Sequence, residues 1–187
     1  MVVKRIITYG GEILLKEIES LGAVYKLKGE TLISVEFLGD EVEELIIPEC
    51  VVQIQNCAFF SVKNVKKITL PKGLTEISSD CFAFLSALEE VCLFEGIKKI
   101  GKRAFIDCKS LKQLIIPEGV QEIGECAFTN CHALERIYIP KTVKKAGKHL
   151  FLNCSNLTVE CEAEKPSALW SREWNKFNLM VNWGAKR

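Results

Sequence analysis

The sequence predicts a solenoid, in which one short structural unit is stacked on copies of itself. Five phenylalanines stand 23 residues apart without a slip, at Phe59, Phe82, Phe105, Phe128 and Phe151. The residues around each phenylalanine repeat with the same period. A unit of this length cannot bury its apolar face alone, so it must stack against its neighbours, and both ends of the stack must be covered.

Five further columns of the repeat are almost wholly apolar and form the predicted core. They are Val51, Leu74, Ile97, Val120 and Val143; Ile54, Ile77, Ile100, Ile123 and Ala146; Val65, Leu88, Leu111, Leu134 and Leu157; Ile68, Val91, Leu114 and Ile137; and Leu70, Leu93, Ile116 and Ile139. In the fifth repeat, Leu157, Val159 and Cys161 fit the strand only if one residue is deleted.

Two columns mark the bends of each repeat. Prolines end the apolar run at Pro48, Pro71, Pro117 and Pro140, because a ring without an amide hydrogen ends a strand and turns the chain. Phe94 breaks this column. Gly101, Gly124 and Gly147 share another column, which predicts either a tight bend or a positive φ angle.

Residues 1–40 are predicted to cap the first coil with a helix and a hairpin. Ile13, Leu14, Ile18 and Leu21 have helical spacing, which favours a helix from Gly11 to Leu21. Val24 to Phe37 is typical of a hairpin that turns at Lys28-Gly29-Glu30. The two elements together would cover the strand edge that an open solenoid exposes.

The repeats are expected to span residues 41–162, and residues 163–187 to form a C-terminal cap. All three tryptophans fall in this last segment, at Trp170, Trp174 and Trp183. Large rings can seal the last coil. Binding of carbohydrate by the tryptophans is the alternative.

Charge gives no reason to expect a nucleic-acid or anionic-membrane partner, since the net charge is +1 over 187 residues. Two columns alternate in sign from coil to coil, which predicts stacked, solvated ion pairs. They read Lys66, Glu89, Lys112 and Glu135, and Gln53, Glu76, Lys99, Glu122 and Lys145.

The location expected for the chain as given is the cytoplasm. Glu12, Lys16, Glu17 and Glu19 interrupt the apolar residues of the first twenty positions, so they lack the uninterrupted stretch of a signal peptide. No run is long enough to cross a membrane. A cell-surface or secreted location is the alternative, if an export signal was removed.

The nine cysteines are expected to be reduced structural thiols. Cys108, Cys131 and Cys154 share a column with Val62 and Leu85, which indicates an apolar interior. No C-x-x-C spacing occurs and only two histidines are present, so no metal or other cofactor is expected.

Catalysis is not expected either. His132 should face water, and His149 shares a column with Cys57, Asp80, Arg103 and Cys126, which indicates a solvated position whose residue type the fold does not dictate. The sequence contains no glycine-rich phosphate loop, no G-x-S-x-G and no H-E-x-x-H. The chain is therefore predicted not to be an enzyme.

The repeat resembles the BspA-type leucine-rich repeat, whose pattern is roughly L-x-x-I-x-I-P-x-x-V-x-x-I-G-x-x-A-F-x-x-C. One stretch matches it in order, at Leu111, Leu114, Ile116, Pro117, Val120, Ile123, Gly124, Ala127, Phe128 and Cys131. The resemblance covers about residues 30 to 184. It implies an α/β solenoid, a right-handed leucine-rich-repeat coil of short strands and short helical turns, here with about five repeats of 23 residues. The family includes adhesins, and the resemblance implies no enzyme.

The candidate binding surface follows from strand alternation. Since Leu114 and Ile116 point inward, Gln113 and Ile115 point outward. The same offsets in four repeats give Lys67, Thr69, Glu90, Cys92, Gln113, Ile115, Arg136 and Tyr138. The apolar members suggest a contact patch, with Tyr138 and Arg136 as the expected anchors. The alternative is a strand face that merely tolerates β-forming residues.

Two classes of function follow from this reading. The first is a non-catalytic interaction scaffold that binds a protein, peptide or glycan through the stacked strand face. The second is a structural protein that assembles through a solenoid end. We expect a monomer or weak homo-oligomer, without nucleic-acid binding or membrane insertion.

Overall fold

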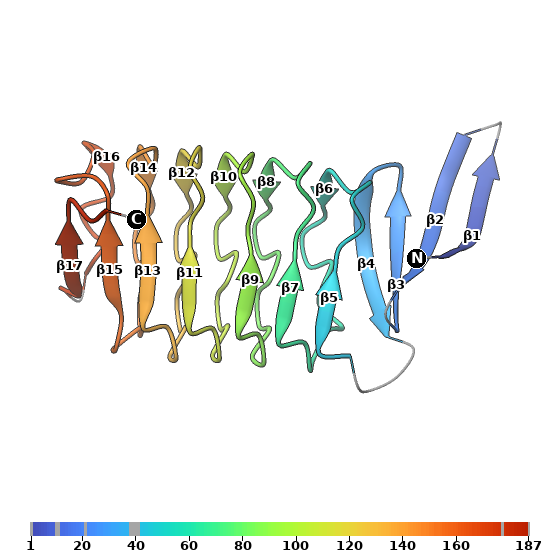
Figure 1. Ribbon diagram of the computed structural model, residues 1–187, viewed down its shortest axis with the longest axis horizontal. Helices are drawn as coiled ribbons and strands as arrows, with labels where there is room; N and C mark the ends of the chain where they lie inside the picture. The colour runs from blue at the N-terminus through green and yellow to red at the C-terminus, as the bar shows by residue number, and fades with distance from the viewer. Residues whose placement is uncertain (1, 10–11, 21, 38–41, 177, 187) are drawn as a thin grey trace.

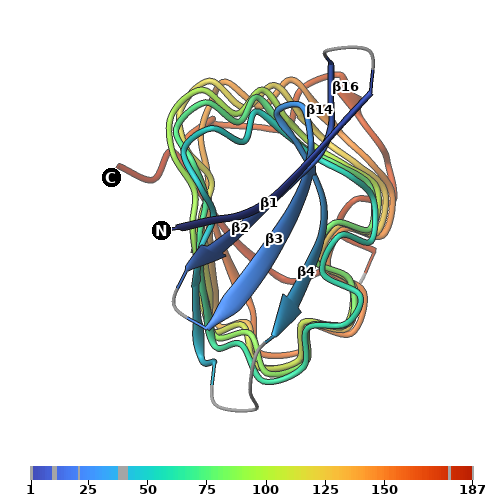
Figure 2. The same cartoon turned by 90° about the vertical axis from the view of Figure 1, so that its right-hand side faces the viewer.

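The structure is a computed structural model that describes residues 2–9, 12–20, 22–37, 42–176 and 178–186, with the backbone alone described up to residue 16. Its coils are stacked side by side along the long axis of the molecule (Figure 1). Viewed along the stack, successive coils lie almost on top of one another (Figure 2). The chain is therefore a solenoid, as its 23-residue period predicts.

Each coil contributes one short strand to a row that we call the strand face. These strands are β5 (Glu44–Ile46), β7 (Lys67–Thr69), β9 (Glu90–Cys92), β11 (Gln113–Ile115), β13 (Arg136–Ile139), β15 (Thr158–Cys161) and β17 (Met180–Trp183). They pair in parallel, in two separate sheets with the orders β5-β7-β9 and β11-β13-β15-β17. Ile137 pairs with Val159, 22 residues on, which confirms the one-residue deletion in the fifth repeat.

A second row of strands runs along another side of the coil. It contains β6 (Gln53–Ile54), β8 (Glu76–Ile77), β10 (Lys99–Ile100), β12 (Glu122–Ile123), β14 (Lys145–Ala146) and β16 (Leu169–Trp170). β8 to β16 form one continuous parallel sheet. β6 belongs instead to the N-terminal sheet, where it pairs with β4.

The N-terminal sheet is antiparallel and consists of β1 (Val2–Tyr9), β2 (Glu12–Ser20), β3 (Ala23–Lys28) and β4 (Thr31–Phe37). The predicted hairpin turn is confirmed, with Gly29 at a φ of 60°. The predicted helix is wrong, because Glu12–Ser20 is a strand; Gly11 and Leu21 lie outside the described residues. A short apolar run fits the periodicity of a helix or of a strand. Here the segment is a strand because it pairs with both β1 and β3.

The described part of the chain contains no helix, so the α/β class expected from the resemblance is wrong and the fold is a β-solenoid. The bends between strands explain this. In the third coil Arg103 and Asp107 have φ angles of 53° and 58°, and a left-handed residue cannot continue a right-handed helix.

The column of His149 varies in residue type, as predicted, and its members are exposed or half-buried. Its five members are all left-handed, with φ angles of 60°, 57°, 53°, 57° and 54° for Cys57, Asp80, Arg103, Cys126 and His149. The fold therefore dictates the backbone conformation at this position, although not the residue type, and such left-handed φ angles are uncommon for residues other than glycine, asparagine and aspartate.

The core is a ladder of phenylalanines flanked by the apolar columns. Successive ring centroids from Phe59 to Phe151 are 5.0, 5.2, 5.5 and 5.6 Å apart. Trp174 extends the ladder by one coil, at 6.3 Å from Phe151, and contacts Trp170 at 5.0 Å. Every residue of the five predicted apolar columns is buried except Leu93, which is partly exposed.

The glycine column results from close stacking and not from a positive φ angle. A Cβ atom on Gly101, Gly124 or Gly147 would lie 2.5, 2.5 or 2.4 Å from a backbone nitrogen of the preceding coil. Such contacts do not occur in folded proteins, so only glycine allows the coils to approach this closely.

The interior cysteines bridge coils as thiols. The Sγ atoms of Cys108, Cys131 and Cys154 donate to the carbonyl oxygens of Phe82, Phe105 and Phe128 at 3.1, 3.1 and 3.0 Å. All three are buried, and all nine cysteines are free. The prediction of buried, unbridged thiols is thereby confirmed for this column.

Candidate functional site

The predicted binding residues all lie on the strand face, but they are not equally exposed. Glu90, Gln113, Ile115 and Arg136 are exposed, and Lys67, Thr69 and Cys92 are half-buried. Ile115 is 48% exposed. Outward orientation is therefore confirmed for the polar members and for Ile115.

The prediction that Tyr138 is an exposed anchor is wrong, because its side chain is only 6% exposed. After β17 the chain returns to the end of β15. The turn is held by a hydrogen bond from the Ala185 amide to the Cys161 carbonyl, at 3.0 Å. Arg136 is also engaged, in an ion pair with Glu160 at 3.3 Å.

The strand face is interrupted between β9 and β11. Every other neighbouring pair in the row is joined by a parallel ladder, whereas none joins these two fully described strands. Figure 1 shows the wider gap at this step. At its lower end the amide of Lys112 still reaches the carbonyl of Glu89, but at 3.4 Å, compared with 2.7 Å for the equivalent bond from Glu89 to Lys66.

At the upper end the step is fully open. The amides of Ile47, Leu70 and Ile116 each donate to a carbonyl oxygen of the next coil, at 3.0, 3.3 and 3.1 Å. Leu93 occupies the same column, and no such bond joins its amide to the Ile115 carbonyl in the described structure. The Leu93 amide and the Ile115 carbonyl thus face the gap without the bond that joins their equivalents in the other coils.

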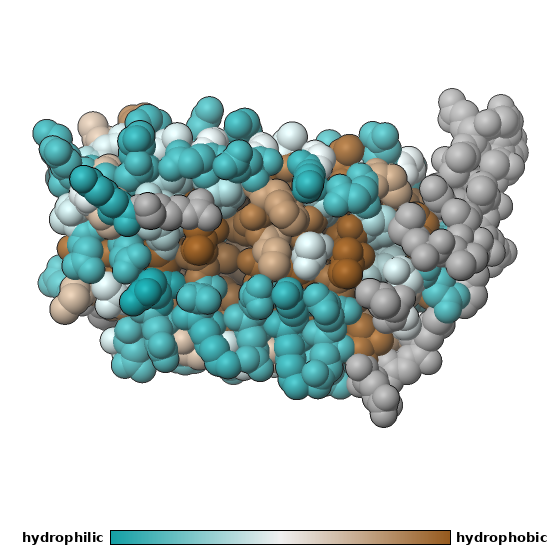
Figure 3. Space-filling model, viewed as in Figure 1, coloured by the Kyte–Doolittle hydropathy of each residue, from teal (hydrophilic) through white to brown (hydrophobic). Residues whose placement is uncertain are grey.

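A cleft of about 580 Å³ occupies this gap. Its apolar lining comes from Cys92, Leu93, Phe94, Ile115 and Pro117. Figure 3 shows an apolar band across the middle of this face, bordered on both sides by polar side chains. The volume lies within the range of about 300 to 1,000 Å³ that is typical of ligand sites.

Phe94 is the sequence feature that coincides with the opening. It stands where four other coils have a buried proline, and it is itself partly exposed. The exception at Phe94 is visible in the sequence, but strand alternation alone does not assign Phe94, Leu93, Lys72 or Glu95 to the site. A break in a repeat column was the signal that could have identified them.

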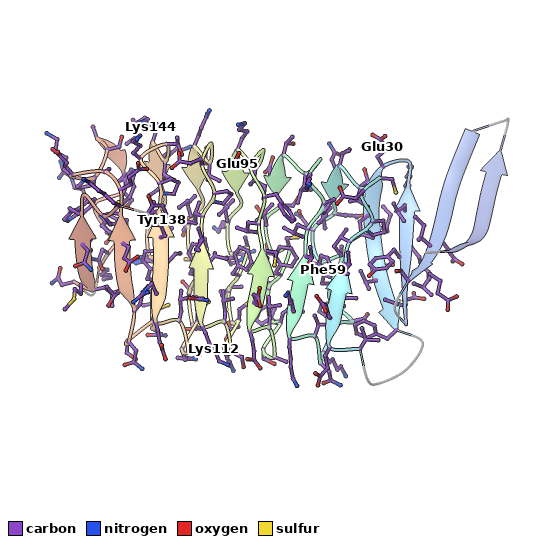
Figure 4. All side chains as sticks on the ribbon, viewed as in Figure 1. Glu30, Phe59, Glu95, Lys112, Tyr138 and Lys144 are labelled. Carbon is purple, nitrogen blue, oxygen red and sulfur yellow. The ribbon has the colours of Figure 1, made fainter. Side chains whose placement is uncertain are left out.

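The charges around the cleft are unevenly paired. Glu90 lies 3.5 Å from the Lys67 ammonium. Lys72 and Glu95 also line the cleft. Within the described residues, neither the Lys72 ammonium nor the Glu95 carboxylate forms an ion pair. Figure 4 places Glu95 on the upper rim of the face and Lys112 on the lower rim.

Cys92 is not set up as a nucleophile. Burial raises the pKa of its thiol, and the hydrogen bond that the thiol donates to Glu90 at 3.4 Å raises it further. The thiol therefore stays protonated at neutral pH and acts as part of the apolar lining.

The charge columns on the rims pair in part as predicted. Lys99 lies 3.1 Å from Glu76, Lys145 lies 3.2 Å from Glu122, and Lys112 pairs with Glu89. These charges are occupied with one another. Exposed pairs of this kind contribute little stability individually.

Neither histidine lines the cleft. His132 is exposed, as predicted, and His149 lies 3.7 Å from the Glu173 carboxylate. Among the described residues, no three His, Cys, Asp or Glu side chains cluster as metal ligands would. A helix of the length and apolarity needed to cross a bilayer is likewise not found there.

Comparisons with known proteins bear on the repeat and on the fold. The family model for the BspA type leucine rich repeat region matches residues 31–158 in six copies. The sixth copy exceeds the expected count of about five. No curated protein matches the chain.

Two solved structures are similar. A leucine-rich repeat protein of T. pallidum is 26% identical with a TM-score of 0.64, over 70% of this chain and 62% of that one. A leucine-rich repeat protein of Bacteroides ovatus is 26% identical with a TM-score of 0.62, over 76% of this chain and 42% of that one. The chain thus spans less than two thirds of either. By its family match and its stacked coils, the chain belongs to the BspA-type leucine-rich repeat family.

Proposed function

We propose that the chain is a non-catalytic scaffold that binds a protein or peptide partner through its strand face. The observation that carries the proposal is the cleft between β9 and β11, where the strand ladder is interrupted and apolar side chains line the opening. Leucine-rich repeat families generally mediate protein interactions, which agrees with this use. A protonated, half-buried thiol and paired surface charges offer no reacting group.

Four of the eight predicted binding residues line the cleft: Glu90, Cys92, Gln113 and Ile115. The centre of the binding surface is accordingly proposed to lie one coil before Arg136 and Tyr138. Lys67 and Thr69 lie on the coil that precedes β9 and would flank a partner that extends along the stack.

The test uses two matched isoleucines in one column. Ile115 and Ile46 are 48% and 45% exposed, and only Ile115 lines the cleft. Partners recovered from cells of the source organism by the normal chain should also be recovered by Ile46→Lys and lost with Ile115→Lys. A partner set that is unchanged in Ile115→Lys would contradict the proposal.

The second candidate function is self-assembly through the C-terminal end. The outermost strands β16 and β17 carry Leu169 and Met180, each 68% exposed. Exposed apolar side chains on an edge strand favour association. Sedimentation equilibrium tests this alternative. It is supported if the normal chain forms a stable oligomer and the variants Leu169→Lys and Met180→Lys are monomers.

A further inference from the structure

We propose that the cleft between β9 and β11 binds an extended peptide segment of a partner, which places one apolar side chain in the cleft and bonds to the two backbone groups at its edge. This inference rests on the proposed function and specifies the chemistry of its ligand. Its three parts are the free backbone groups, the apolar lining and the charges at the rim.

The backbone groups favour a peptide over other ligands. The Leu93 amide and the Ile115 carbonyl are partners that the closed steps of the stack would join, as Ile116 and Tyr138 are joined at 3.1 Å. A trans peptide unit carries its C=O and its N–H on opposite sides. It can therefore accept from Leu93 and donate to Ile115 when it enters between β9 and β11. This requires the two strands to move apart, because some of their Cα atoms lie within 8 Å of each other and two strand spacings amount to about 9.6 Å.

The lining selects an apolar side chain of leucine or phenylalanine size. Phe94 and Ile115 provide large apolar surfaces, and Leu93, whose column is buried in every other coil, is partly exposed here. Water in contact with these groups is released when an aliphatic side chain covers them. Burying such a side chain is worth more than a tenfold gain in affinity over alanine.

The rim selects a peptide that carries both signs of charge. Lys72 and Glu95 line the same cleft from adjacent coils and keep their charges unpaired within the described part of the chain. An acidic and a basic residue next to the apolar one would complement them. A peptide with two acidic or two basic neighbours would leave one rim charge facing its own sign.

The experiment uses blocked pentapeptides with a central leucine between one aspartate and one lysine, in both orders. Three controls replace the leucine with alanine, methylate the leucine nitrogen, or replace both charges by two aspartates. Binding is followed by the amide signals of the protein in NMR titrations up to about 5 mM peptide, which detects dissociation constants in the millimolar range.

One of the two charge orders should shift the amide signal of Leu93. The alanine and the N-methyl peptides should each bind at least about tenfold more weakly, because they lack the apolar side chain or the backbone donor. Ile115→Lys and Phe94→Pro should remove the shifts, and Ile46→Lys should retain them. Phe94→Pro restores the proline of the column and should fold normally.

Several results would overturn the inference. Equal binding of the N-methyl peptide and its parent would mean that the backbone groups take no part. Shifts confined to other residues, or no shift at all, would also contradict it. If cello- or malto-oligosaccharides shift the Leu93 signal and the peptides do not, the ligand is a glycan.

These outcomes separate the inference from the proposed function. Loss of a cellular partner in Ile115→Lys without any peptide binding would leave the scaffold function standing and reject the extended peptide. An unchanged partner set in Ile115→Lys would reject the function at this site.

Discussion

Two adjacent steps of the stack, each formed by the contact of one coil with the next, differ in whether their strands pair. Between β11 and β13 three residue pairs form a parallel ladder, and Ile116 is fully buried. Between β9 and β11 the equivalent ladder is missing, and Leu93 is partly exposed. Since the repeat length is identical at both steps, the difference comes from individual side chains and not from the coil.

The side chains concerned are exceptions within their columns. Phe94 replaces proline at the open step of the strand face. On the second row, the ladder is missing between β6 and β8, and there Ser78 replaces the column glycine. Its hydroxyl donates to the Ile54 carbonyl at 2.7 Å, in place of a close backbone approach. Each break in a sheet thus coincides with a break in a column.

The largest expected effect comes from shortening the matched residues Ile116 and Leu93. Ile116→Ala should destabilise the fold by about 2 to 5 kcal/mol, since it leaves a cavity in a closed step. Leu93→Ala should cost less than half of that, because its side chain already contacts solvent. Urea unfolding of both variants measures the difference, and equal costs would mean that the two steps are packed alike.

A smaller effect is expected from the glycine column. Gly124→Ala should cost about 1 to 3 kcal/mol, because the new Cβ would lie 2.5 Å from the Lys102 backbone nitrogen and the coils must separate. Ser78 lies at the unpaired step between β6 and β8. Its substitution Ser78→Ala should cost about 1 kcal/mol, the value of one hydrogen bond. Thermal unfolding compares them, and the reverse order would contradict the close-approach explanation.

The smallest effect is expected for Phe94→Pro. The Phe94 amide donates no backbone hydrogen bond in the described structure, so a proline removes none. Stability should change by no more than about 1 kcal/mol. A loss of several kcal/mol would show that the phenylalanine ring supports the coil and does not merely line the cleft.

Much of this comparison was accessible from the sequence, and its limits have physical causes. The 23-residue period fixed the columns, so the buried positions, the charge ladders and the outward side of each strand were predictable. The helix expected near Ile18 was wrong, because periodicity over a short apolar run does not distinguish helix from strand. The helical turns implied by the resemblance were wrong because the bends are left-handed, as at Arg103.

The candidate site was predictable only in part. Strand alternation placed Ile115 and Gln113 on the correct surface, but it treats every coil as equivalent. It therefore could not show that Tyr138 is buried or that Leu93 is partly exposed. Such differences depend on contacts between coils, which the period alone does not contain.

The most direct test of the open step is amide hydrogen exchange measured residue by residue. Leu70 and Ile116 donate their amides to the next coil, and Leu93 does not. Exchange at Leu93 should therefore be at least about 100-fold faster than at Ile116, since protection requires a buried hydrogen bond. Equal protection of Leu93 and Ile116 would show that the strand face is continuous, and would contradict the open step from which the binding site is inferred.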